Sequence, residues 1–484
     1  MSQENKGYAT LKALDKPHQS QPDSSWGGHA VVAVAWDNDN ERVLCKNSWG
    51  QANYPYFWMQ YHWITDFEAT DDFWVVRTID HSNPPTRISG PVFDGHVEVT
   101  GFGWKMNRQT TSGNHDKAST AANSVIASVV RNYEMPETFW VSPQWQVLSK
   151  VFTRSNTGSL DLGSSEVPEG TSFGSPSTYV EITKGAVIPG AIAAVKRNEE
   201  RTDTFCIRCD GSICCYTKPN TKTGWSMSGS LTGLEIDGTF RDSVKASIKG
   251  GIAVVSRIQG HQEIWYVTPE GAIEGLYFYE GDSAGWNKYE LAPQGSADPS
   301  SFITAVTAGS ERMFVLWISK DGKLSGKQWV NDGQSWRDTF AAKTFAPYSA
   351  AMRSRIAAVS RRNDTVEVFF ITPKGVIEAA YWYEFQGSWT RWNMAKYSAR
   401  VDSGLTAIML NDKRMEVLWV GSNNSLVVAS FMEGWNWRQN VVAGPGSVMG
   451  GSPLGTFWRS EKSYSVMFQD YTNKLIAADF QGPE

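Results

Sequence analysis

A chain of 484 residues can form two or more domains with buried cores, and its 41% apolar and 20% charged residues indicate a globular protein rather than a disordered one. The net charge of −5 and the lack of a long Lys/Arg run argue against nucleic-acid binding, and no apolar run is long enough to predict a membrane-spanning helix. The 22 tryptophans require many aromatic-cored strands or many exposed stacking sites.

The first residues, MSQENKGYATLKALDKP, contain no apolar core of the kind that a signal peptide needs. We therefore expect a cytoplasmic protein if the start shown is the true start; its localisation is otherwise unknown. The five cysteines, four of them within one short stretch, do not follow the pattern of a secreted disulfide framework.

Residues 27–50, GGHAVVAVAWDNDNERVLCKNSWG, predict a β-hairpin. Two alternating apolar segments, HAVVAVAW and RVLCKNSW, flank DNDNE, which has the residues that turns prefer. A hairpin brings the start of one strand beside the end of its partner. His29 and Asn47 are therefore expected to be neighbours in space.

A linker is expected at residues 79–91, IDHSNPPTRISGP, because this stretch has Pro-Pro, Ser and Gly and no apolar periodicity. It separates a first domain, residues 1–78, from a second, residues 92–484.

The second domain contains a repeat of short apolar strand, polar turn and second apolar strand, clearest in GGIAVVSRIQGHQEIWYVTP from Gly250 and SRIAAVSRRNDTVEVFFITP from Ser354. A tight turn follows at a residue that tolerates positive φ, and these turn residues recur at intervals of 49 to 60 residues. They are Gly211, Gly271, Gly322, Gly375, Asn424 and Asn473. A further strand follows in each unit and carries a tryptophan in five of them: Trp225, Trp286, Trp336, Trp389 and Trp435.

A period near fifty residues with about four strands per unit predicts a β-propeller, so the expected fold class is mainly β. The last unit has no tryptophan strand of its own, and residues 93–105, FDGHVEVTGFGWK, form a single strand-like piece before the first unit. This piece is expected to complete the last blade and close a ring of seven blades. Six or eight blades remain alternatives, because the unit from Ser124 lacks its tryptophan and has a polar insertion at residues 154–180.

Residues 26–78 resemble the C-terminal half of the papain-like cysteine peptidases, family C1, in GGHAVVAV, VLCKNSWG, YFWMQYHWI and DDFWVV. The resemblance implies a half-domain of barrel-like strands in which His29 takes the proton of a cysteine thiol, Asn47 orients the imidazole and Trp49 shields their hydrogen bond. None of the 28 residues before His29 is a cysteine, and Cys45 is expected to pack in the core, so the nucleophile is absent. Hydrolysis by this chain alone is therefore not expected. There are two alternatives: a separate chain supplies the missing half, or the missing half was lost from the gene model.

Residues 93–482 resemble the seven-bladed lectin propellers of the Photorhabdus lectin type through the pattern IAAVSR, VEVFFITPKGVIEAAYWY and GSW. This resemblance implies sugar pockets between blades, aromatic stacking, and glycans or glycoproteins as partners. Two functions therefore compete: a papain-type peptidase targeted to glycans by its propeller, and a lectin-like protein whose peptidase segment is vestigial.

Two sets of repeated residues are candidates for sugar binding. Arginines after the first strand of four units either bind sugar hydroxyls or form ion pairs with a following acid, as in Arg257 with Glu263 and Arg361 with Glu367. The other two are Arg131 and Arg197. The repeated tryptophans are expected to pack between blades, whereas Trp392 and Trp437 are the better candidates for exposed stacking.

The stretch CIRCDGSICC, residues 206–215, contains four cysteines. If residues 210–211 form the turn, Cys206 lies opposite Cys215, and Cys214 points to the other face. Four thiolates, Cys209 included, then do not converge easily, so a contact between Cys206 and Cys215 or plain core packing is expected. No metal and no cofactor are predicted.

Overall fold

The computed structural model divides into two compact units, Met1–Phe73 and Trp74–Glu484, and each is described by itself. The structure describes residues 9–10, 32–37, 42–46, 56–60, 98–99, 104–108, 120–121, 124–130, 136–151, 180–181, 187–219, 226–230, 235–236, 239–240, 244–283, 285–333, 335–339, 349–394, 398–433, 437–460, 462–471 and 475–481. In this described part, no helix is long and apolar enough to cross a membrane, and no group of three or more His, Cys, Asp and Glu side chains could hold a metal.

The N-terminal unit contains one sheet with the strand order β1-β4-β3-β2. Its strands are β1 (Ala9–Thr10), β2 (Val32–Asp37), β3 (Arg42–Lys46) and β4 (Tyr56–Gln60). β2 and β3 are antiparallel, with Val32 opposite Lys46, which confirms the predicted hairpin. Cys45 is buried in this sheet, and burial raises the pKa of its thiol, so it is a packing residue and no exposed nucleophile.

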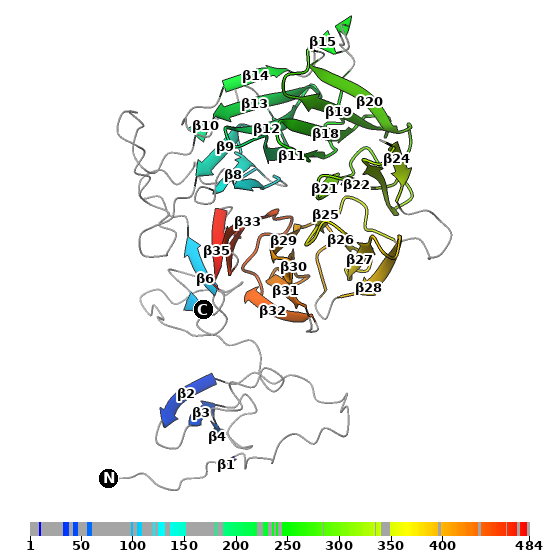
Figure 1. Ribbon diagram of the computed structural model, residues 1–484. Coiled ribbons are helices and arrows are strands. Elements are labelled where there is room, and N and C mark those ends of the chain that lie inside the picture. The colour runs from blue at the N-terminus through cyan, green and yellow to red at the C-terminus, as the bar shows by residue number, and fades with distance from the viewer. Residues whose placement is uncertain are drawn as a thin grey trace. The chain divides into compact units, whose positions relative to one another are not determined.

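The second unit is a propeller of seven blades, each an antiparallel sheet, and in the first six the strands follow one another in chain order (Figure 1). The first three blades are β7 (Ala127–Val130), β8 (Pro136–Val141), β9 (Val147–Val151) and β10 (Val180–Glu181); β11 (Val187–Lys196), β12 (Arg201–Arg208), β13 (Ile213–Pro219) and β14 (Ser226–Ser230); and β17 (Ile252–Val255), β18 (His261–Val267), β19 (Ile273–Tyr279) and β20 (Trp286–Ala292). A small ribbon, β15 (Glu235–Ile236) and β16 (Thr239–Phe240), follows the second blade.

The next three blades repeat the same four-stranded pattern. They are β21 (Thr304–Ala308), β22 (Arg312–Ile318), β23 (Leu324–Val330) and β24 (Ser335–Asp338); β25 (Ile356–Val359), β26 (Thr365–Ile371), β27 (Ile377–Tyr383) and β28 (Ser388–Asn393); and β29 (Leu405–Asn411), β30 (Arg414–Val420), β31 (Leu426–Met432) and β32 (Arg438–Ala443).

The seventh blade joins distant parts of the chain. β33 (Leu454–Ser460), β34 (Ser463–Gln469) and β35 (Leu475–Gln481) are followed in the sheet by β6 (Trp104–Arg108) and β5 (Glu98–Val99). β6 pairs antiparallel with β35, with Phe480 opposite Trp104. The strand that fills the fourth place is therefore residues 104–108, which begin near the end of the sequence piece 93–105. The proposed linker, residues 79–91, lies outside the described residues.

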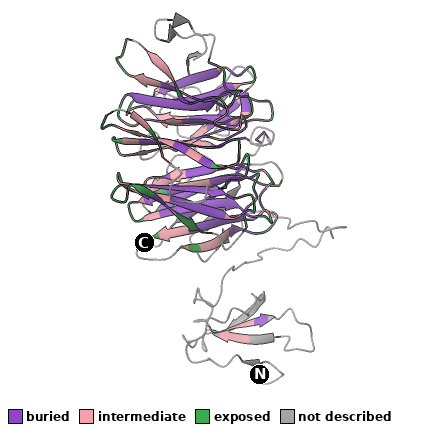
Figure 2. Ribbon diagram, turned by 90° about the vertical axis from the view of Figure 1, so that its right-hand side faces the viewer, coloured by how far each residue is buried: buried purple, intermediate pink, exposed green. Residues whose placement is uncertain are grey.

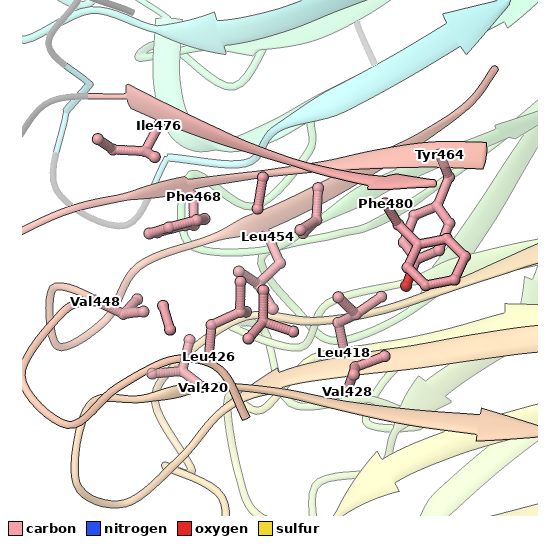
Figure 3. Packing of buried hydrophobic residues seen from close by; sticks show 14 of the residues in the cluster. Leu418, Val420, Leu426, Val428, Val448, Leu454, Tyr464, Phe468, Ile476 and Phe480 are labelled. Atoms are coloured by element: carbon pink, nitrogen blue, oxygen red, sulfur yellow. The ribbon is translucent and has the colours of Figure 1, made fainter. Parts of the chain in front are cut away.

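The core consists of apolar layers between neighbouring blades (Figure 2). Between the sixth and seventh blades, Leu418, Val420 and Val428 on one sheet face Leu454, Phe468 and Phe480 on the other (Figure 3). The second strand of each blade is buried on both faces. Strands such as β26, with the sequence TVEVFFI, are therefore nearly continuous runs of apolar residues.

The predicted turn residues connect neighbouring blades. Gly211, Gly271, Gly322, Gly375 and Asn424 all have positive φ, between 63° and 82°, whereas Asn473 lies outside the described residues. The carbonyl oxygen of each accepts a hydrogen bond of 2.7–2.9 Å from an N–H of the segment that leads into the next blade: from Ala246, Ala297, Ala350, Ala399 and Val448. The first blade uses Trp145 in this place, with φ 64° and a bond from the Val187 N–H.

Candidate functional site

The repeated arginines lie at boundaries between blades. Five described arginines place the guanidinium over an aromatic ring from the third strand of the next blade, at 4.5–5.6 Å from Cζ to ring centroid: the repeated Arg197, Arg257 and Arg361, and Arg312 and Arg414, which begin the second strand of their blades. The pairs are Arg197 with Phe278, Arg257 with Trp329, Arg312 with Trp382, Arg361 with Phe431 and Arg414 with Phe480. The aromatic residue has the same register position in all five blades, the second residue from the strand's end. This contact is therefore part of the repeat itself.

At the boundary of the fifth and sixth blades, Arg361 and Glu367 bind each other. Arg361 Nε donates to Glu367 Oε1 at 2.8 Å, and Nη2 lies 2.7 Å from the same oxygen. Arg361 Nη1 also donates to the Asp412 carbonyl of the sixth blade at 3.2 Å. Both members are buried, at 7% and 3% exposure, and burial raises the pKa of Glu367 against the opposing effect of Arg361. The expected ion pair therefore exists, and it also joins two blades.

Arg257 and Glu263 form no hydrogen bond or ion pair with each other. Arg257 donates to the Ser310 carbonyl at 2.6 Å and to the Tyr279 hydroxyl at 3.3 Å. Glu263 accepts a hydrogen bond of 2.5 Å from the Tyr289 hydroxyl. The sequence expectation of an ion pair is therefore wrong for this blade, because a tyrosine on the outer strand reaches the carboxylate instead.

The equivalent acids of other blades are also paired. Asp203 accepts from Arg197 Nε and Nη2 at 2.7 and 2.8 Å, which is a bidentate pair. In the first blade the acid is Glu137, and Lys218 occupies the aromatic position of the next blade, with its Nζ 3.3 Å from Glu137 Oε1. Here the anion keeps its place and the cation comes from the next blade, a variation that the repeat alignment alone did not reveal.

The repeated tryptophans pack edge-on against an aromatic residue of the preceding blade. The ring pairs are Phe205 with Trp286, Trp265 with Trp336, Phe314 with Trp389 and Phe369 with Trp437, at 5.8–5.9 Å and interplanar angles of 81–90°. Trp437, and not Trp435, thus occupies the blade-packing place in the sixth blade, and it also contacts Phe431. From the sequence, Trp437 was a candidate for exposed stacking, but it is half-buried and packs against Phe369. Trp225 and Trp435 lie outside the described residues.

Trp392 differs from this set because it is 50% exposed on the outer strand β28. Strand alternation places it on the same face as Met394, which is buried in the cluster between the fifth and sixth blades. Its cross-strand neighbour is Ala379, which leaves the ring uncovered from that side. Trp392, Trp437, Arg361 and Glu367 therefore belong to one blade boundary.

Three exposed aromatic residues of the described part escaped the sequence analysis: Trp145, Phe385 and Tyr471. Phe385, in the turn after β27, is 77% exposed, and its ring lies 5.6 Å from that of Tyr383 in a tilted arrangement. Trp145 is 45% exposed and has positive φ, a backbone conformation that bulky residues rarely adopt. Alignment of its turn with the glycine turns of the other blades is the signal that could have identified it.

The proposed peptidase residues His29, Asn47 and Trp49 lie outside the described residues, as does Arg131. In their hairpin, the last described pair of opposite residues is Val32 and Lys46.

The cysteine hairpin has a different register from the expected one. Cys206 lies opposite Cys214, and Phe205 lies opposite Cys215. The reason is a five-residue loop between Ile207 and Ile213, in which Gly211 provides the positive φ. Cys206, Cys214 and Cys215 are buried and Cys209 is exposed, and none of these four forms a disulfide; burial raises the pKa of Cys206 well above its ordinary value. The three buried side chains serve as small packing groups.

Comparison with known proteins gives one short and several long similarities. No family model matches the chain. An "uncharacterized peptidase C1-like protein" of Acanthamoeba polyphaga mimivirus is 36% identical over 55 residues, 11% of this chain and 18% of that protein. The chain thus spans less than a fifth of the length of this curated relative.

Among solved structures, the BP39L lectin from Burkholderia pseudomallei matches 76% of this chain and 99% of its own chain, with a TM-score of 0.59 and 14% identity. The similarity shows a shared propeller fold. The fucose-specific lectin from the fungus Aleuria aurantia matches 68% of this chain and 99% of its own, with a TM-score of 0.45 and 15% identity.

Proposed function

We propose that the propeller binds carbohydrate at its blade boundaries, and that the boundary of the fifth and sixth blades is the best of these sites. The observation that carries the proposal is Trp392, an indole left 50% exposed beside that boundary. An exposed indole can pack against the C–H groups of a pyranose face, and the neighbouring polar groups then fix the orientation of the sugar. The fold shared with a bacterial lectin supports the same function.

Arg361 and Glu367 enter this proposal as the polar pair beneath the surface. Glu367 Oε2 is buried and has no hydrogen-bond partner, so it can accept one from a hydroxyl group. Because that oxygen is buried, a sugar hydroxyl reaches it only when neighbouring side chains move aside. Trp437 would then supply the half-buried ring wall of the pocket.

Arg257 and Glu263 are proposed as the corresponding pair at the boundary of the third and fourth blades. Arg257 Nε is buried without a partner, which leaves a donor for a hydroxyl oxygen. Repeated sites of this kind would bind multivalent glycans more strongly than single sugars, provided that their spacing lets several sites engage together.

A glycan array tests the proposal with the parent chain, Trp392→Ala and Phe385→Ala. Phe385 is the matched control, because it is also an exposed aromatic residue of the fifth blade but lies in a turn. The expected result is binding by the parent and by Phe385→Ala, and loss of binding by Trp392→Ala. If the parent binds none of the fucosylated, galactosylated or methylated glycans, a protein-binding or purely structural propeller replaces this function.

A second proposal concerns the N-terminal unit. We infer that its segment around His29 and Asn47 is related to papain-like peptidases but does not hydrolyse peptides without a cysteine from elsewhere; the short peptidase C1-like similarity supports the relationship. The test compares peptide hydrolysis by the parent, His29→Ala and, as a control, His62→Ala. If the parent and His62→Ala hydrolyse peptides and His29→Ala does not, the chain is a complete enzyme.

A further inference from the structure

The innermost strands of the seven blades line a cavity of about 290 Å³ on the propeller axis that is partly open to solvent. All seven blades contribute residues to its wall, and most of these are Ala, Gly, Ile, Val and Leu. Polar side chains are few, and they include the hydroxyls of Ser128, Thr304 and Thr406. Among the described residues that line the cavity, Arg355 is the one charged side chain.

Arg355 breaks the repeat. In the strand alignment, all six other blades have an apolar or small residue at its position: Val125, Ala191, Gly251, Phe302, Gly404 and Pro453. The arginine therefore does not arise from the requirements of a blade, unlike Arg197, Arg257 and Arg361. The blade structure therefore does not explain why a charged residue lines the shared cavity at this position.

The surroundings of Arg355 stabilise its position but do not balance its charge. Its Cζ lies 3.3 Å from the centroid of the Phe302 ring. Gly251 makes room for this ring, because a Cβ there would lie only 3.3 Å from Phe302 Cδ1. Arg355 forms no hydrogen bond or ion pair with another described residue, and no Asp or Glu is among the lining residues. Arg355 is partly buried, and burial lowers the pKa of its guanidinium to about 9, with no carboxylate of the lining residues beside it to oppose that shift.

We infer that the central cavity is a binding site for a small monocarboxylate, with the carboxylate group on the Arg355 guanidinium and an apolar body against the small side chains. A guanidinium presents two parallel N–H donors, which match the two oxygens of a carboxylate. One carboxylate charge balances one guanidinium, whereas a phosphate dianion would leave an uncompensated negative charge beside it. Most side chains of the wall are apolar, so a hydrocarbon body can pack against them. This site is separate from the blade boundaries at which carbohydrate binding is proposed.

Binding of sodium acetate, butyrate and benzoate to the whole chain tests the inference, by isothermal titration calorimetry and ligand-observed NMR at constant ionic strength. The affinity is expected to rise from acetate to butyrate, since more apolar surface is buried, and to fall about tenfold or more in Arg355→Gln. Arg355→Lys keeps the charge but not the paired donors and should bind with intermediate affinity. Arg337→Gln, an exposed arginine on β24, is the control and should bind as the parent does.

The inference is overturned if the parent binds none of the three carboxylates, or if inorganic phosphate binds as well as butyrate. It is also overturned if Arg355→Lys and Arg355→Gln keep the parent affinity. Circular dichroism of each variant establishes that it is folded. If Arg355→Gln does not fold, the parent measurements and the Lys variant decide the question. The glycan array is independent of these outcomes, because it depends on Trp392.

Discussion

The guanidinium of Arg361 in the fifth blade lies 4.7 Å from the Phe431 ring of the sixth blade, while the same group binds Glu367 of its own blade. One side chain thus combines an ion pair within a blade with a cation–π contact between blades. A buried ion pair that loses one member leaves the other as an uncompensated charge.

Glu367→Ala is therefore expected to lower the free energy of unfolding by about 3 kcal/mol or more. The double variant Arg361→Met/Glu367→Met should recover much of this loss, because it removes both charges and keeps apolar volume. Urea denaturation measures both. Asp402→Ala is the control, since Asp402 binds Arg400 at the surface and its loss should cost less than about 1 kcal/mol. Equal losses in Glu367→Ala and in the control would show that burial of the pair has no effect on stability.

Gly271→Ala should destabilise the propeller more than Gly322→Ala. Both glycines have similar positive φ, 78° and 73°, so an alanine meets the same backbone strain at either position. A Cβ at Gly271 would lie 2.4 Å from the Ala297 carbonyl oxygen, whereas at Gly322 the nearest atom, the Ala350 oxygen, is 3.5 Å away. The additional clash should add about 1 kcal/mol or more to the loss in urea denaturation. A larger loss in Gly322→Ala would contradict the close approach of the blades at Gly271.

Trp145→Gly should be more stable than Trp145→Ala by about 1 kcal/mol. Both changes remove the indole, so the difference between them isolates the left-handed backbone at φ 64°. Chemical denaturation of the two variants gives this difference directly. Equal stabilities would mean that the turn of the first blade relaxes to a conformation that a Cβ tolerates.

Glu416→Gln tests how a buried carboxyl group affects the pH dependence of stability. Burial raises the pKa of Glu416 from 4.5 to about 7, although Arg414 Nε donates to Glu416 Oε1 at 2.8 Å. Because the folded pKa lies above the unfolded one, this group stabilises the fold fully below about pH 4.5, and its contribution is lost as the pH rises through about 7. The amide that replaces the carboxyl group in the variant does not titrate and has no such dependence.

The free energy of unfolding of Glu416→Gln minus that of the parent should therefore rise by up to about 3 kcal/mol between pH 4.5 and pH 8. Urea denaturation at several pH values provides the measurement. Glu433→Gln, at an exposed carboxyl group, is the control and should show a difference that changes little with pH. A constant difference for Glu416→Gln as well would show that Arg414 balances the charge.

Much of the fold could be predicted from the sequence, because its signals are local. Gly271 and Gly375 mark turns since few residues tolerate positive φ, and the regular spacing of such turns predicts the blades. The register of the cysteine hairpin was wrong by one residue because loop length, and not composition, determines which of Cys214 and Cys215 faces Cys206.

The candidate site was less predictable because its contacts cross from one repeat to the next. Arg361 could be recognised as a repeated residue, but its partner Phe431 belongs to the following blade. Trp435 and Trp437 are two residues apart, and only the ring contact with Phe369 identifies which one packs. Arg355 shows no pattern at all in the sequence, since its significance depends on a cavity that seven separate strands build.

The seventh blade determines when the propeller can be completed during synthesis. β6 is translated before any full blade, yet its partner β35 is translated after all the other propeller strands. Blades one to six are each contiguous in sequence and can fold one after another as they emerge from the ribosome. The strand β6, however, presents an unpaired edge throughout this time, and joining it to β35 closes the longest loop in the propeller. Ring closure is thus the last step of propeller assembly, and the nascent chain has to protect one β-strand edge until it occurs.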